Sequence, residues 1–328
     1  MSPIAFDFDF TPNYGAAVEL EPGLRRVVAK NPNRFTFRGT GTYIIGTTSV
    51  AVIDPGPAID SHFDALIAAI GDAQVSHILI THTHRDHSPL SARLQDATGA
   101  ATYGFGPHGD VPHADADDQI DFGVIEEADA DDNQDEQEDE TQSEHADGGY
   151  DDQFVPDVAV RHGDIIVGEG WSMDCVHTPG HTSNHICFGW RETHELFSGD
   201  HVMGWSTSVI SPPDGDMATY MASLELLLDR DDTVYWPTHG NPIRNPHEHV
   251  RAFIAHRQGR EAAIVDLIGS GTTSIEAIVR SMYTQVHPKL YGAAARSVHA
   301  HIVHLVENHV VTSASGQNRL TDRYSLAT

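Results

Sequence analysis

The stretch Thr81-His82-Thr83-His84-Arg85-Asp86-His87 decides the interpretation of this sequence. It follows the apolar run 76–81, which predicts a short buried strand. It precedes Ser88-Pro89, which predicts Ser88 as the N-cap and Pro89 as the first residue of a helix that runs to about Thr98. A loop in that place can turn several side chains toward one point. Imidazole nitrogens and carboxylates are ligands of zinc and similar ions. We expect the two histidines spaced by one residue to reach one ion, and the Asp-His pair to reach a second.

Three more candidate ligands follow other predicted strands. His181 stands in Thr-Pro-Gly-His, Asp200 in Ser-Gly-Asp and His239 in Pro-Thr-His-Gly. Glycine and proline beside each ligand allow the sharp turns that such a site needs. The sequence therefore predicts a metal centre made by His82, His84, Asp86, His87, His181, Asp200 and His239.

Hydrophobic patterning around these motifs predicts an α/β domain. A hairpin is expected over 42–46 and 49–53, and a helix over 60–70 with Asp60 or Ser61 as its N-cap and Gly71 at its exit. Further strands are expected over 164–167, 171–177, 185–190, 195–198 and 233–236, and a helix over 216–228.

The last part of the chain has a different pattern. Helices over 258–267, 274–283 and 292–307, followed by β segments at 310–312 and 319–325, predict a winged-helix arrangement. We therefore divide the chain into a catalytic domain, 1–250, and a winged-helix-like domain, 251–328. The third helix offers Arg296 as its only arginine or lysine, so no DNA binding is expected.

Residues 107–157 form an acidic insert. The formal net charge is −29, yet 20 of the 48 acidic residues lie between 110 and 157, where there is no Lys or Arg. Like charges repel there and little apolar surface offsets the ordering entropy, which predicts a disordered insert. Its role, as a solvated insertion or as a contact for a partner, stays open.

Composition also bears on the compartment. The only cysteines, Cys175 and Cys187, stand in apolar runs, so a disulfide framework is not expected. The first residues lack a basic segment, and no apolar run reaches the roughly 20 residues that span a bilayer. We expect a cytoplasmic protein without membrane attachment.

Taken in order, the ligand motifs resemble those of the metallo-β-lactamase superfamily. Asp54 in Val-Ile-Asp-Pro-Gly is similar to that superfamily's first motif. More narrowly, the strings 81–89, 178–185 and 198–207 and the run from Asn245 to Arg257 resemble the lactamase-beta-like protein 2 group, which also carries a winged helix. The acidic insert departs from that pattern, as does Gly41, where asparagine is expected.

The resemblance implies a four-layer αββα sandwich with the metals at one edge of its two sheets. It implies that His82, His84 and His181 hold one ion, that Asp86, His87 and His239 hold the other, and that Asp200 bridges them. Asp54 would orient the ligands through hydrogen bonds.

Two ions that share a hydroxide predict a hydrolase. Zn²⁺ is the expected metal, with Mn²⁺ or Fe as alternatives. We expect Asp86 and His185 to act in catalysis, the latter on a leaving group or an oxyanion. The substrate is left open among an ester, a lactone, a thioester and a phosphodiester.

Three alternatives remain at this point. Some relatives cleave single-stranded RNA, but phosphate affinity comes mainly from Lys and Arg, and this chain has two Lys, Lys30 and Lys289. Similar motifs also occur in iron-dependent persulfide dioxygenases, which use one iron. A non-enzymatic interaction protein would leave the complete ligand set without a role. The sequence does not indicate the oligomeric state.

Overall fold

The computed structural model describes residues 4–109, 118–120, 122 and 149–327. Its contacts divide the chain into two units. The sandwich unit comprises Met1–Val111, Tyr150–Ile210 and Asp214–Arg257, and the C-terminal unit comprises Pro112–Gly149, Ser211–Pro213 and Gln258–Thr328. Most of the acidic insert lies outside the described residues, so its predicted disorder is not tested.

The first sheet of the sandwich unit has seven strands in the order β1-β2-β3-β4-β5-β6-β7. The pairs from β1 to β4 are antiparallel, and those from β4 to β7 are parallel. The predicted hairpin is confirmed as β3 and β4, whereas β1, β2, β6 and β7 had no sequence prediction. The bounds are β1 Val18–Glu21, β2 Leu24–Val28, β3 Gly41–Gly46, β4 Ser49–Ile53, β5 Gln74–Leu79, β6 Ala101–Gly104 and β7 Val158–Ala159.

The second sheet has five strands in the order β12-β11-β10-β9-β8. Only the pair β11–β12 is parallel among its described pairings. All five strands lie where the hydrophobic runs predicted them. The bounds are β8 Ile165–Val167, β9 Ser172–His177, β10 Ile186–Trp190, β11 Glu195–Gly199 and β12 Val234–Pro237.

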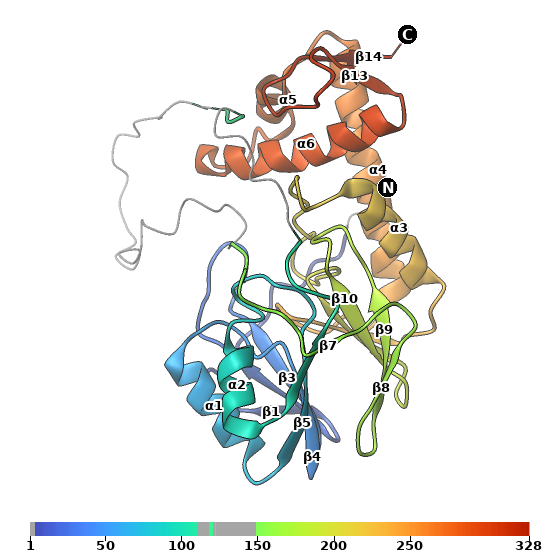
Figure 1. Ribbon diagram of the computed structural model, residues 1–328. Helices are drawn as coiled ribbons and strands as arrows, with labels where there is room; N and C mark the ends of the chain where they lie inside the picture. Colours follow the sequence, from blue (N-terminus) through green and yellow to red (C-terminus); the bar gives the residue numbers. More distant parts are fainter. Residues whose placement is uncertain (1–3, 110–117, 121, 123–148, 328) are drawn as a thin grey trace, which may run out of the picture. The chain divides into compact units, whose positions relative to one another are not determined.

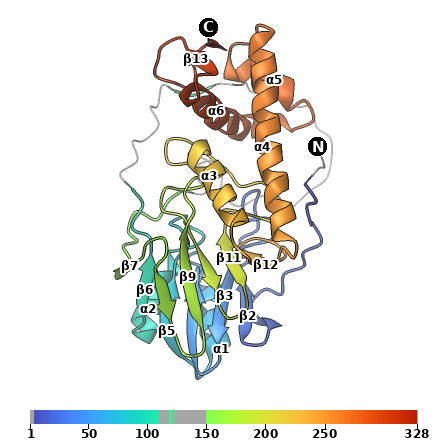
Figure 2. The ribbon, with the colours of Figure 1, turned by 90° about the vertical axis from the view of Figure 1, so that its right-hand side faces the viewer.

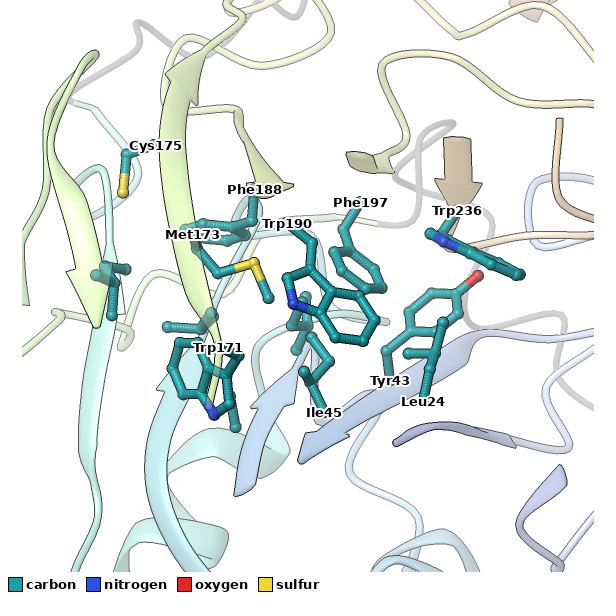
Figure 3. Close-up of a cluster of buried hydrophobic side chains, with 14 of the residues drawn as sticks. Leu24, Tyr43, Ile45, Trp171, Met173, Cys175, Phe188, Trp190, Phe197 and Trp236 are labelled. Carbon is teal, nitrogen blue, oxygen red and sulfur yellow. The ribbon is translucent and has the colours of Figure 1, made fainter. Parts of the chain in front are cut away.

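A large aromatic core fills the space between the two sheets. Tyr43 from the first sheet lies with Phe197 and Trp236 from the second, and all three are at most 2% exposed (Figure 3). The Tyr43 hydroxyl donates to the carbonyl of Pro237 over 2.6 Å, which satisfies its polar atom within the core. Burial of these large side chains holds the sheets together.

Helices cover both outer faces of the sheet pair (Figures 1 and 2). α1, Asp60–Ile70, and α2, Leu90–Thr98, pack on the first sheet through a second apolar cluster. α3, Met217–Leu228, and the first half of α4, Pro246–Gly269, flank the second sheet. The order helix, sheet, sheet, helix confirms the predicted four-layer αββα fold.

The predicted helix starts need correction. Ile59 is the N-cap of α1 and makes no side-chain cap, so neither Asp60 nor Ser61 caps this helix. Pro89 occupies the N-cap position of α2, and Ser88 instead donates its Oγ to Asp151 Oδ2 over 2.7 Å. A partner distant in sequence thus competes for the capping hydroxyl.

The C-terminal unit contains the predicted three helices and small β element. The second half of α4 packs with α5, Ile275–Met282, and α6, Tyr291–Glu307, around a core of aliphatic side chains. β13, Val311–Ser313, and β14, Tyr324–Leu326, pair as an antiparallel hairpin. The first predicted helix is not separate, because α4 runs unbroken through residue 258.

Two findings bear on the expectations from composition. Cys175 and Cys187 are both free and buried. Across the described ranges, no helix has the length and apolar character that crossing a membrane requires.

An ionic cluster in the C-terminal unit predicts a specific pH effect. Burial would raise the pKa of Glu261, but Nδ1 of His301 and Nδ1 of His304, at 3.3 and 2.7 Å, lower it to about 2. A carboxyl with a depressed folded-state pKa stabilises the fold above its unfolded pKa, about 4.3 for Glu. That contribution is lost as the pH falls toward 2.

We therefore expect Glu261→Gln to lower the free energy of unfolding above about pH 5, and this deficit to shrink as the pH falls to 2. Urea unfolding followed by circular dichroism, at several pH values, measures the difference from the unmodified protein. Glu276→Gln, which removes an exposed i,i+4 pair with Arg280, is the control. A deficit for Glu261→Gln that stays constant with pH would contradict the assignment.

Candidate metal centre

All seven predicted ligands gather in loops that follow strands of both sheets. His82, His84, Asp86 and His87 follow β5, whereas the other three follow β9, β11 and β12. Ligand atoms within 4.8 Å of one another form three overlapping groups: His82, His84 and His181; His82, His87 and Asp200; and Asp86, His87 and His239.

The first group consists of three buried imidazoles. His84 Nδ1 lies 2.9 Å from His82 Nε2 and 3.1 Å from His181 Nε2. The other ring nitrogen of His181 donates to the Val209 carbonyl over 2.6 Å. A carbonyl only accepts, so neutral His181 carries its proton on Nδ1 and presents the Nε2 lone pair to the other two rings.

The second group combines imidazoles with a carboxylate. Asp86 Oδ2 lies 3.3 Å from both His87 Nε2 and His239 Nε2. The opposite nitrogens of the two rings donate to Asp54 Oδ2, at 2.9 Å, and to the Gly39 carbonyl, at 3.2 Å. When these rings are neutral, their lone pairs face the carboxylate, and this arrangement is repulsive without a cation or protons between them.

Asp200 lies between the two groups. Its Oδ1 is 3.6 Å from His87 Nε2 and 3.4 Å from His239 Nε2, whereas Oδ2 is 3.9 Å from His181 Nε2. Within the described ranges, Asp200 Oδ1 and His87 Nε2 are buried without a hydrogen-bond partner. Buried polar atoms seldom lack partners. The donor set therefore fits a cation in each group, with Asp200 facing both.

The two groups differ in electrostatic character. Burial and neighbouring imidazoles lower the pKa of His82 and His84 well below 6.5, which favours neutral nitrogen ligands. Burial also acts to lower the pKa of His239, but Asp200 and Asp86 outweigh it and raise the value to about 10. The first group is thus a neutral nitrogen site, and the second is a site that attracts positive charge.

Asp54 joins three loops of the site. Its Oδ1 accepts from the Thr81 amide over 2.8 Å, and its Oδ2 accepts from Thr81 Oγ1, His87 Nδ1 and Thr238 Oγ1 at 2.7, 2.9 and 3.3 Å. The residue is 1% exposed and has φ of 49°, a conformation that Asp adopts more readily than most residues. These contacts fix the ring of His87.

Sequence reasoning missed two residues that touch the site. Thr40 Oγ1 donates to Asp86 Oδ2 over 2.9 Å, and the ring of Tyr150 stacks on His84 with centroids 5.1 Å apart. Both lie far along the chain from the ligand they contact, and neither belongs to a motif. Only the folded chain brings them to the loop after β5.

The structure explains the unexpected glycine at position 41. A Cβ there would lie 3.0 Å from the Thr238 carbonyl oxygen and 3.1 Å from Arg26 Cδ. The Gly41 amide donates to that same carbonyl over 2.8 Å. This close approach leaves little room for a side chain beside the His239 loop.

His185 lies behind the ligands. Its side chain is fully buried, its Nδ1 contacts Thr178 Oγ1 at 2.9 Å, and its Nε2 accepts from the Asp200 amide over 3.3 Å. Both ring nitrogens are therefore engaged by the protein. The catalytic role of His185 stays a prediction that these contacts do not favour, and they give it a positioning role for Asp200.

The fold and the site together define the class of protein. Residues 36–239 match the model of the metallo-beta-lactamase superfamily, and residues 274–318 match the beta-lactamase associated winged helix domain. The chain belongs to the metallo-β-lactamase superfamily and carries that associated winged helix.

Individual relatives narrow the comparison. The chain is 29% identical over 302 residues to a beta-lactamase-like protein 2 homolog of Drosophila melanogaster, covering 88% of this chain and 89% of the relative. It is 25% identical to an atrochrysone carboxyl ACP thioesterase of Cryptosporiopsis, covering 81% and 73%. A beta-lactamase domain protein from Burkholderia ambifaria superposes with a TM-score of 0.74 at 19% identity, covering 98% and 97%. This last likeness shows the fold alone.

The Asp54 contacts predict the effect of Asp54→Asn. Asparagine tolerates the positive φ, but its amide group cannot accept from all the donors that surround the carboxylate. We expect affinity for the ion at His87 to fall about 10- to 100-fold, as for other residues that orient metal ligands.

Zinc titration in competition with a chromogenic chelator measures this change. Asp60→Asn is the control because the Asp60 side chain is 90% exposed and pairs with Arg93 at the surface. Equal zinc affinities in the two variants would show that Asp54 does not support the site.

Proposed function

We propose that this protein is a hydrolase that uses two divalent metal ions, and that its substrate is an acyl thioester. One observation carries the proposal: nitrogen lone pairs and two carboxylates converge in a buried space, with the oxygens of Asp200 directed to both ligand groups. An isolated structural site would need a single closed ligand set.

The chain's residues divide naturally between two ions. His82, His84 and His181 would hold the first, Asp86, His87 and His239 would hold the second, and Asp200 would contact both. Nitrogen and carboxylate donors in these numbers suit zinc. When bound, two such ions supply an activated water and positive charge that stabilises the substrate oxygen.

Asp86 is the carboxylate best placed to meet the attacking water. Its side chain is 20% exposed, twice the value of Asp200. In the described part of the chain, Thr40 and the two imidazoles contact Oδ2, and Oδ1 can accept a hydrogen bond from a water molecule. The carboxylate thus orients the nucleophile, while Thr40 holds its other oxygen.

Two observations support a thioester as the substrate. Relatives with 25% identity are named acyl carrier protein thioesterases. The charge of the chain, with 19 basic and 48 acidic residues, disfavours an extended nucleic acid backbone. A thioester needs no large basic surface, so it ranks ahead of RNA and other phosphodiesters.

The persulfide dioxygenase alternative makes a different demand on the site. One iron in the first group would leave Asp86, His87 and His239 facing one another without a cation. Against the effect of burial, Asp200 and Asp86 raise the pKa of His239 to about 10, so without a second ion this ring would hold a proton there instead. The donor types and close spacing of Asp86, His87 and His239 suit a second ion, which supports the dinuclear proposal.

Metal content tests the proposal directly. We expect elemental analysis of freshly purified protein to give about two zinc or manganese ions per chain, and a strong chelator to abolish thioester hydrolysis. About one iron per chain, with oxygen consumption on persulfides, would replace the hydrolase proposal.

Single ligand substitutions test the residues. Asp86→Ala and His181→Ala should each lower thioester hydrolysis by at least about 100-fold, comparable to losing a strong electrostatic stabiliser, and should reduce bound metal. His194→Ala is the control because this histidine is 57% exposed and pairs with Asp231 at the surface. Full metal content and rate in either ligand variant would refute the assignment.

A further inference from the structure

Arg257 is a buried cation that the proposed chemistry does not use. It ends the run from Asn245 to Arg257, lies on α4 in the sandwich unit and is 3% exposed. Among the described residues, no carboxylate lies within 4.0 Å of its guanidinium, and its Nε is buried without a hydrogen-bond partner. Burial of an unpaired cation is unfavourable, so its remaining contacts indicate the role that offsets this cost.

Those contacts lead to the loop after Asp200. Arg257 Nη2 donates to the Ser208 carbonyl over 2.5 Å, and its Cζ lies 5.3 Å from the centre of the Tyr220 ring. Tyr220 Oη and Ser208 Oγ both donate to the His201 carbonyl, at 2.9 and 2.7 Å. The segment from 201 to 208 is therefore held at both ends.

The residue after Ser208 connects this loop to the metal centre. Val209 follows Ser208 directly, and its carbonyl accepts the hydrogen bond from His181 Nδ1. The peptide unit of Ser208 is planar and ends at Val209 Cα, so fixing the Ser208 carbonyl limits the position of that atom, and only the φ and ψ angles of Val209 separate it from the Val209 carbonyl. The acceptor that sets the tautomer and ring orientation of His181 is thus held through Ser208 by Arg257.

We propose that Arg257 is a positioning residue for the metal ligand His181. The inference rests on the proposed function in that it takes His181 as a ligand. The guanidinium donates to the Ser208 carbonyl while its Cζ lies over the Tyr220 ring. A lysine ammonium can supply the hydrogen bond but lacks the planar group, and a neutral side chain of similar length supplies neither.

Three variants of the full chain test the proposal. Arg257→Met removes the donor, Arg257→Lys keeps one, and Arg251→Met makes the same change at an exposed position of the same helix. Zinc competition titrations give the affinity of each ion, and the visible spectrum of the cobalt-substituted protein reports ligand geometry. Circular dichroism confirms that each variant is folded.

We expect Arg257→Met to lower the affinity for one zinc ion about 10- to 100-fold and to change the cobalt spectrum. Arg257→Lys should show a smaller loss of affinity, and Arg251→Met should bind zinc like the unmodified protein. Equal affinities in Arg257→Met and Arg251→Met would overturn the proposal. If Arg257→Met does not fold, Arg257→Lys decides: unchanged affinity and spectrum overturn it, and a several-fold loss supports it.

A double variant tests the route through His181. The double variant combines His181→Ala with whichever Arg257 variant folds. If Arg257 acts through His181, the double variant should bind zinc almost as tightly as His181→Ala alone. Additive losses would mean that Arg257 acts elsewhere. A wild-type protein that binds a single ion would contradict the dinuclear proposal, whereas the comparison with Arg251→Met would still decide the role of Arg257.

Discussion

The structure depends on one electrostatic constraint: imidazole nitrogens and two carboxylates occupy the same buried space. His181, His87 and His239 each use Nδ1 to donate to a protein acceptor, which turns Nε2 inward. Metal ions or ring protons must supply positive charge among these groups, and the carboxylates accordingly outweigh burial and raise the pKa of His87 and His239. Much of the surrounding hydrogen bonding holds the rings and carboxylates in this arrangement.

The sandwich provides the rigidity. Each ligand loop begins where a buried strand ends, and the aromatic core between the sheets fixes the strands. Asp54 then joins the loops after β4, β5 and β12 through a single carboxylate. Gly41 allows the β12 loop to approach β3 closely. Strain at φ 49° is tolerated at Asp54 because its contacts determine its position so fully.

The electrostatics of the site contrast with those of the chain. The whole chain is strongly acidic, whereas the first ligand group consists of neutral imidazoles and the second places two carboxylates beside two imidazoles in a largely buried environment. Burial strengthens each interaction there, because the effective dielectric constant is lower than in water. Arg257 adds a buried positive charge that acts on the loop rather than on a ligand carboxylate.

The sequence by itself determined the class of fold and the chemical nature of the site. The patterns of 81–87, His181, Asp200 and His239 carry this information because ligand type and the preceding strand are local properties. The positions of the strands in the second sheet followed from hydrophobic runs for the same reason.

The tertiary structure alone decided the contacts between distant residues: Thr40 with Asp86, Tyr150 with His84, Ser88 with Asp151, and Arg257 with Ser208. It also gave the ring nitrogens of His185 contacts with Thr178 Oγ1 and the Asp200 amide, which the sequence did not predict. Such pairings depend on where packing brings separate segments together, and no local pattern of residues encodes that.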